Sequence, residues 1–143
     1  MAALLILCTV AALWPATAKA QVYVDLVWEQ LKAVQQVAAE GGYGTQNYII
    51  GSLREDQSDA WTITLYGGYD YMILAACDGD CQDLDIRLYD EDGNEIDQDE
   101  STDNVPTIEG RVDTTGRFTI EVDMFECSED YCYFGFGVFG RAY

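Results

Sequence analysis

From about residue 44 onward, apolar and polar residues alternate with a period of two, and this pattern constrains the fold more than any other feature of the chain. Within 60–66, for example, Trp61, Ile63 and Leu65 fall on one side and two threonines on the other. Because successive side chains of a β-strand point to opposite faces, such a segment predicts a strand with one buried face. Several strands of this kind must bury their apolar faces against one another.

The alternation recurs in three longer segments, and turn residues rich in Gly and Asp separate them. The inward-facing sets are Leu84, Ile86 and Leu88; Phe118, Ile120, Val122 and Met124; and Cys132, Phe134, Phe136 and Val138. Tyr69–Cys77 is apolar on both faces, as in a central covered strand. Shorter strands fit 47–53, 94–97 and 105–112. The pattern predicts an all-β fold, a jelly-roll-like antiparallel β-sandwich of about eight strands.

The first forty residues follow other patterns. In Val24–Ala39 apolar residues recur at three- and four-residue steps, which predicts a short amphipathic α-helix packed on the sandwich or on a second copy. Residues 1–20 have the apolar run and the small residues before a cleavage point that are typical of a secretory signal peptide. We therefore expect a signal peptide over 1–20, a helical extension over 21–43 and a sandwich domain over 44–143.

A membrane anchor is the alternative for the first segment, but its apolar run is shorter than the roughly 20 residues that a span needs. After cleavage we expect a periplasmic or secreted product with no stable membrane span. Four cysteines then remain: Cys77, Cys81, Cys127 and Cys132. An even number of cysteines in an oxidising compartment predicts two disulfides. Three pairings are open, the local ones being favoured, and a zinc site with four cysteine ligands is the alternative.

Charge and composition limit the function. The 26 acidic residues against 7 basic ones give a net charge of −19, which opposes binding to nucleic acid and to anionic membranes. The chain has no histidine, which removes Ser-His and Cys-His nucleophile systems and histidine metal ligands. We expect a protein that is not an enzyme and whose partner is an exported protein or a cell-envelope polymer.

The densest chemical feature is a run of carboxylates between residues 78 and 103. Carboxylate oxygens closely spaced on turns suit Ca²⁺, the only cofactor that the sequence predicts. The predicted ligands are Asp78, Asp80, Asp83, Asp85, Asp90, Asp92 and Asp97. A simpler interpretation also holds, because aspartates are common in hairpin turns and outward-facing ones prevent edge pairing and keep a protein in solution.

Four segments share a pattern with one known family. They are Asp59–Gly68, with Trp61 and Leu65; Tyr71–Ala75; the hairpin Asp83-Leu-Asp-Ile-Arg-Leu-Tyr-Asp90 with Asp92-Gly93-Asn94; and Thr115–Val122. Over roughly residues 51–140 the chain resembles the bacterial pre-peptidase C-terminal domain family. The resemblance implies a β-sandwich that accompanies secreted proteases as a non-catalytic appendage and in some members binds calcium or collagen. The present sequence departs from that setting, because it contains no protease domain and carries four cysteines.

Three hypotheses follow for the function. The first is an exported, non-catalytic binding or structural module stabilised by Ca²⁺. The second is a carbohydrate-binding module that uses aromatic side chains, although Trp61 is in phase with the core residues. The candidate aromatic residues are Trp28, Tyr66, Tyr69, Tyr71, Tyr89, Tyr131, Tyr133 and Tyr143. The third is a small hydrolase with two converging carboxylates, and no pair is singled out by the sequence.

Overall fold

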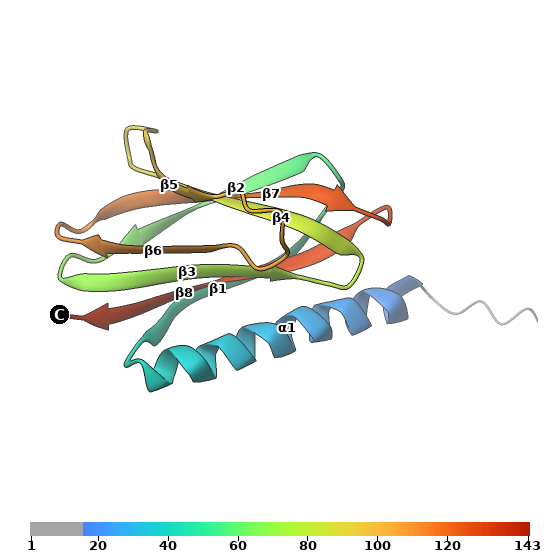
Figure 1. The fold of residues 1–143 in the computed structure, drawn as a ribbon, viewed down its shortest axis with the longest axis horizontal. Helices are drawn as coiled ribbons and strands as arrows, with labels where there is room; N and C mark the ends of the chain where they lie inside the picture. The colour runs from blue at the N-terminus through green and yellow to red at the C-terminus, as the bar shows by residue number, and fades with distance from the viewer. Residues whose placement is uncertain (1–15) are drawn as a thin grey trace, which may run out of the picture.

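The computed structural model describes residues 16–143, which form one helix followed by eight strands (Figure 1). Residues 1–15, the greater part of the predicted signal peptide, lie outside the described residues. The elements are α1 (Ala16–Glu40), β1 (Gly44–Leu53), β2 (Gln57–Leu65), β3 (Tyr69–Cys77), β4 (Cys81–Tyr89), β5 (Glu95–Asp99), β6 (Thr107–Val112), β7 (Gly116–Cys127) and β8 (Cys132–Ala142). Every predicted strand is present.

The strands form two four-stranded antiparallel sheets, ordered β1-β8-β3-β6 and β2-β7-β4-β5, which stack as two layers (Figure 1). This order, with consecutive strands alternating between the sheets at the start of the chain, is that of a jelly roll. The prediction of a jelly-roll-like sandwich is confirmed. β3 lies between β8 and β6, as its apolar faces predicted.

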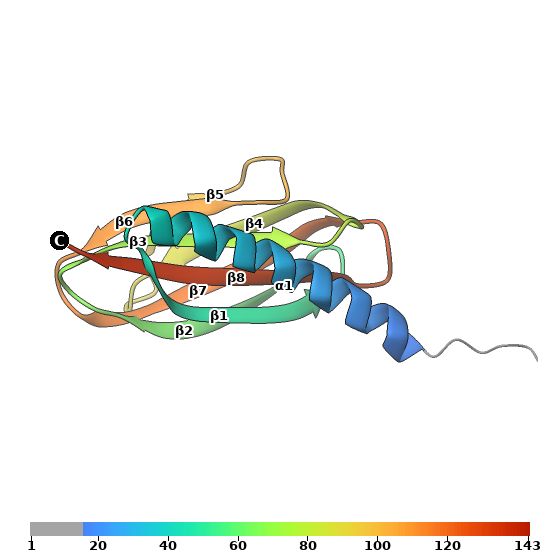
Figure 2. The ribbon, with the colours of Figure 1, turned by 90° about the horizontal axis from the view of Figure 1, so that it is seen from below.

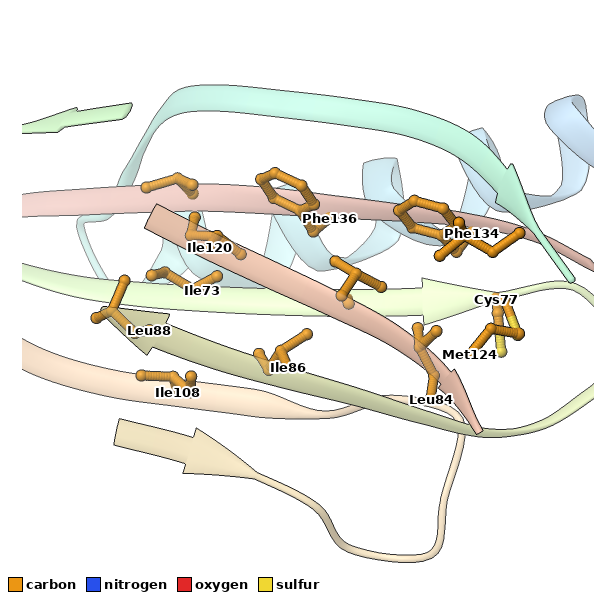
Figure 3. Close-up of a cluster of buried hydrophobic side chains, with 14 of the residues drawn as sticks. Ile73, Cys77, Leu84, Ile86, Leu88, Ile108, Ile120, Met124, Phe134 and Phe136 are labelled. Carbon is orange, nitrogen blue, oxygen red and sulfur yellow. The ribbon is translucent and has the colours of Figure 1, made fainter. Parts of the chain in front are cut away.

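The core lies between the layers and consists of the inward-facing sets that the alternation predicted. Phe134 and Phe136 of β8 point toward side chains of the opposite sheet, among them Ile120 of β7 and Leu84 of β4 (Figure 3). All four are at most 1% exposed. Burying an aromatic or branched side chain contributes about 1.5–3 kcal/mol, so these buried side chains stabilise the packing of one sheet on the other.

Helix α1 packs on the outer face of the β1-β8-β3-β6 sheet and runs along β8 (Figure 2). Val27 and Leu31 are buried against Gly135 of β8, and a Cβ added to this glycine would lie 2.9 Å from both side chains. The glycine therefore allows the close approach of the helix. The predicted apolar stripe is confirmed, and it packs on the sandwich of the same chain.

The helix is longer than the sequence pattern predicted, because it begins at Ala16 rather than near Val24. It ends at Glu40, and Gly42 follows in the left-handed region with φ 81°. Among helix residues 19–40, whose burial the structure describes, the first buried one is Val27, so the predicted cleavage after Ala20 would leave the described buried stripe intact. Within the described part of the chain, no helix combines the length and apolar character needed to cross a membrane.

Candidate functional site

Two disulfides close neighbouring loops at one end of the sandwich. The bonds are Cys77–Cys81 and Cys127–Cys132, so the favoured local pairing is confirmed. The amide and the hydroxyl of Ser128 both donate to the carbonyl oxygen of Asp80, each at 2.9 Å, and thus tie one loop to the other. Disulfides persist in oxidising compartments, which indicates an exported protein.

We call this region the disulfide end and define it as the loops 54–56, 78–80 and 128–131. The turn 54–56 belongs to it because the amide of Asp56 donates to the carbonyl of Met124, close to the second disulfide. The three loops contain six carboxylates and one cation. The disulfide end is therefore a negatively charged surface whose loops are held in place by the two disulfides.

Asp78 anchors the first loop from within. One oxygen of its carboxylate accepts the amide of Asp80 at 3.1 Å, and the other accepts the amide of Tyr133 at 2.7 Å. Burial raises the pKa of Asp78, while these two donors oppose the shift. Both oxygens are thus used within the protein, and the role that the geometry gives Asp78 is to hold the first loop against the start of β8, directly after the second loop.

Aromatic side chains surround the carboxylates of the disulfide end. Tyr131 and Phe125 are 46% and 57% exposed, and the Arg54 guanidinium lies 4.8 Å from the centre of the Tyr131 ring. Tyr23 of α1 stacks on Tyr133 with ring centres 5.8 Å apart. A hydrogen bond to the Asp80 carboxylate raises the pKa of Tyr23. The loops therefore present both negative charge and aromatic surface.

Asp83 and Asp85 occupy a different place, on the outer face of β4. Both are only 6% exposed, because the segment after β5 lies beside them and the carbonyl of Asp103 accepts the amide of Leu84 at 2.9 Å. Burial raises the pKa of Asp83, and burial together with the charge of Asp83 raises that of Asp85 to about 6. Among the described residues, Asp83 Oδ1 is a buried oxygen without a hydrogen-bond donor.

Arg87 partly offsets this negative charge. Its guanidinium pairs with Glu100, with Glu121 at 3.2 Å and with Asp123 at 3.5 Å. These hydrogen bonds, chiefly that with Glu100, raise the pKa of Arg87. On the outer face of the β2-β7-β4-β5 sheet, Arg87 is therefore held among several carboxylates, which outnumber it and the exposed Arg117, so the charge of this face stays negative.

The remaining predicted ligands lie at the opposite end of β4 from the disulfides. The Asp90 carboxylate accepts the amides of Asp92 and Asn94 at 2.9 and 2.8 Å, and a hydrogen bond from the Asn94 side chain, ahead of these backbone donors, lowers its pKa. Asp97 accepts the amide of Gln98. The seven predicted ligands are thus spread over three places. Within residues 16–143, no three acidic or cysteine side chains are arranged to hold a metal ion. Calcium binding stays a prediction.

The aromatic residues predicted to form a carbohydrate-binding surface also lie in different parts of the structure. Trp61 packs against Phe134 and Phe136, with ring centres 5.7 and 5.4 Å away, so it joins the core as its phase indicated. Tyr71 is buried and its hydroxyl accepts the amide of Tyr66. Tyr66 and Tyr143 lie at the end opposite the disulfides, far along the strands from Tyr131.

The sequence interpretation missed the second disulfide loop as a surface. It treated Cys127 and Cys132 only as disulfide partners, although the residues between them are Ser-Glu-Asp-Tyr. A loop this short, closed by a disulfide, has no interior, so its two carboxylates and its tyrosine are exposed to solvent. That composition was the available signal.

Comparison with known proteins identifies a fold relative and no family. No family model and no curated protein match the chain. Among solved structures, it is similar to the crystal structure of Aeromonas hydrophila PliG, a periplasmic lysozyme inhibitor of g-type lysozyme. The likeness has a TM-score of 0.51 and 10% identity, and it covers 71% of this chain and 90% of that chain. At this identity it shows the fold alone.

Proposed function

We propose that the protein is a periplasmic or secreted, non-catalytic binding protein that docks onto a cationic exported protein through its disulfide end. The observation that carries the proposal is the pair of disulfide-closed loops tied side by side by Ser128 and Asp78. They present carboxylates and exposed aromatic rings on one rigid surface.

The physical argument has two parts. A surface that is already ordered loses little conformational entropy on binding, so more of the contact energy appears as affinity. Tyrosine is enriched among the residues that dominate binding energy, and Tyr131 is the exposed ring inside a closed loop. Around it, the five carboxylates of the disulfide end other than the buried Asp78 would steer a basic partner toward this end and exclude acidic ones.

Two comparisons support the proposal. The fold relative PliG is a periplasmic inhibitor of g-type lysozyme, so a sandwich of this kind can serve as a protein-binding inhibitor. Membership of the pre-peptidase C-terminal domain family, which we also propose from the segments Asp59–Gly68 and Asp83–Asn94, would likewise imply a non-catalytic module. We infer that binding, and not turnover, is the activity to test.

The test is titration calorimetry of the processed protein against a g-type lysozyme and a panel of basic exported proteins. The variant Glu129→Gln/Asp130→Asn removes two charges from the disulfide end, and Glu91→Gln/Asp92→Asn removes two from the hairpin at the other end of β4. We expect the first pair to weaken binding about tenfold and the second less than about twofold. Equal losses, or no binding to any basic protein, would reject the proposal.

Calcium is a separate proposal that we attach to Asp83 and Asp85. Asp83 Oδ1 lacks a donor, and several carboxylates surround the pair, so a divalent ion would relieve their repulsion. Calorimetry with CaCl₂ on wild type and on Asp83→Asn tests it. A variant that binds calcium as wild type does would contradict it.

A further inference from the structure

A cavity of about 380 Å³ lies between the two sheets, beside the edge strands β5 and β6. Its inner lining is apolar and consists of Leu65, Tyr71, Ile73, Leu88, Ile108 and Phe118. Sites for small molecules are concave, mostly apolar and about 300–1,000 Å³ in volume. The cavity has the size and the lining of such a site.

Gly110 of β6 keeps this cavity open. Ile108 and Val112, two residues to either side, line the cavity, so residue 110 also occupies an inward-facing position. A Cβ built on Gly110 meets no heavy atom within 4 Å. The φ angle of Gly110 is not positive, so the backbone does not require glycine at this position. A branched residue is the usual occupant of such a position, and its absence leaves the space unfilled.

The opening of the cavity is negatively charged. The carboxylate residues Asp97, Glu109 and Asp113 line it and are exposed. Arg111 is the one cation of the lining, and its Nε donates to Asp70 at 2.8 Å. Asp70 also pairs with Arg141 at 3.3 Å and so neutralises Arg111 only in part. The three carboxylates of the lining still outnumber this one cation, so the opening repels an anionic head group and attracts a cationic one.

We propose that this cavity binds an amphiphilic cation, whose apolar chain fills the space beside Gly110 and whose ammonium group lies near Asp97 and Asp113. The chain would contact the same side chains that form this end of the core. The site lies at the end of the sandwich away from the disulfides. It stands apart from the proposed protein-binding function and does not depend on it.

The test uses decyltrimethylammonium, decanoate and tetramethylammonium, each below its micelle concentration, with calorimetry and thermal unfolding as readouts. We expect decyltrimethylammonium to bind at least about tenfold more tightly than either of the others and to raise the melting temperature. Gly110→Leu should abolish this binding without loss of stability, because its side chain enters open space. Gly79→Leu, where an added Cβ also meets nothing within 4 Å, is the matched control.

A second pair of variants separates the site from general attraction to an acidic protein. Asp97→Asn/Asp113→Asn should weaken decyltrimethylammonium binding about tenfold, whereas Glu129→Gln/Asp130→Asn should leave it unchanged. This pair also serves if Gly110→Leu fails to fold. The proposal is overturned if decanoate binds as tightly as the cation, if the two charge variants lose affinity equally, or if wild type binds none of the three probes.

Discussion

The two outer faces of the sandwich come from the same alternating pattern and differ in what lies on them. On the β1-β8-β3-β6 sheet, Gly135 and its neighbours leave room for α1, and the helix covers the face with apolar side chains. On the β2-β7-β4-β5 sheet, the outward positions carry charged residues such as Arg87 and Glu121, and the described residues place no helix there. Only the segment after β5 covers Asp83 and Asp85 on this face. Small residues permit a covering element, and charged ones keep a face toward water.

This difference teaches that outward positions are informative when they are read across neighbouring strands. One outward glycine on β8 says little by itself. Gly135 and Gly137 together, next to the half-buried Met72 and Leu74 of β3, form an apolar surface that needs a cover. The four predictions below test this contrast, in order of decreasing effect.

The largest effect is expected where the covered face is disturbed. Gly135→Val would place side-chain atoms inside contact distance of Val27 and Leu31, so the helix must shift. We expect a loss of about 3 kcal/mol in the free energy of unfolding, measured with urea. Thr62→Val, an outward position on the uncovered face, should change it by less than about 0.5 kcal/mol. Similar losses in both variants would remove the contrast between the faces.

A smaller effect, with a pH signature, is expected from the buried charge on the uncovered face. The pKa of Asp85 is raised to about 6 in the folded state, so its ionisation destabilises the fold as the pH rises from about 4 to above 6. Asp85→Asn should therefore stabilise the protein by about 2 kcal/mol at pH 8 and by little at pH 4. Urea unfolding across this range measures it, with exposed Asp92→Asn as the control. A gain that is independent of pH would contradict the assignment.

Removing the Arg87 guanidinium should reduce the free energy of unfolding by a smaller amount. Arg87→Met leaves Glu100, Glu121 and Asp123 without their shared partner, and the side chain is 21% exposed. We expect a loss of about 1–2 kcal/mol at pH 8 and a smaller one at pH 5, where Asp85 is mostly protonated. Arg117→Met, an exposed position on the same sheet, provides the comparison. A loss equal to that of Arg117→Met would show that the ion pairs of Arg87 contribute nothing to the free energy of unfolding.

The smallest effect is expected on the solvent side of the helix. Lys32 pairs with Glu29 at 2.7 Å, and their side chains are 41% and 69% exposed. Lys32→Gln should change the free energy of unfolding by less than about 0.5 kcal/mol. A larger change would mean that charge on α1, and not only its apolar stripe, holds it to the sheet.

Much of the fold followed from the sequence, because strand alternation reports directly on burial. Ile63, Ile86 and Phe136 were assigned to the core by phase alone and are buried. The start of α1 was missed, since residues 16–23 lack the apolar spacing used to recognise the helix. The strand order could not be derived either, because pairing joins segments as distant as Leu53 and Cys132.

The candidate site was predictable only in part. The carboxylates were recognised, but sequence proximity could not show that both oxygens of Asp78 accept backbone amides while Oδ1 of Asp83 has no donor. Outward aspartates two residues apart on β4 share a face, whereas β4 itself separates Asp80 from Asp90. The cavity beside Gly110 could not be predicted, since it depends on how β5 and β6, which follow each other in the chain, are placed at the edges of different sheets.

The sequence separations of the two disulfides, four and five residues, also bear on how the protein matures after export. In an unfolded chain, thiols this close collide far more often than thiols some fifty residues apart, because closing a short loop is the cheaper event. Oxidation should therefore yield the native pairs before the sheets assemble. Such a protein would regain its bonds after reduction without the help of an isomerase.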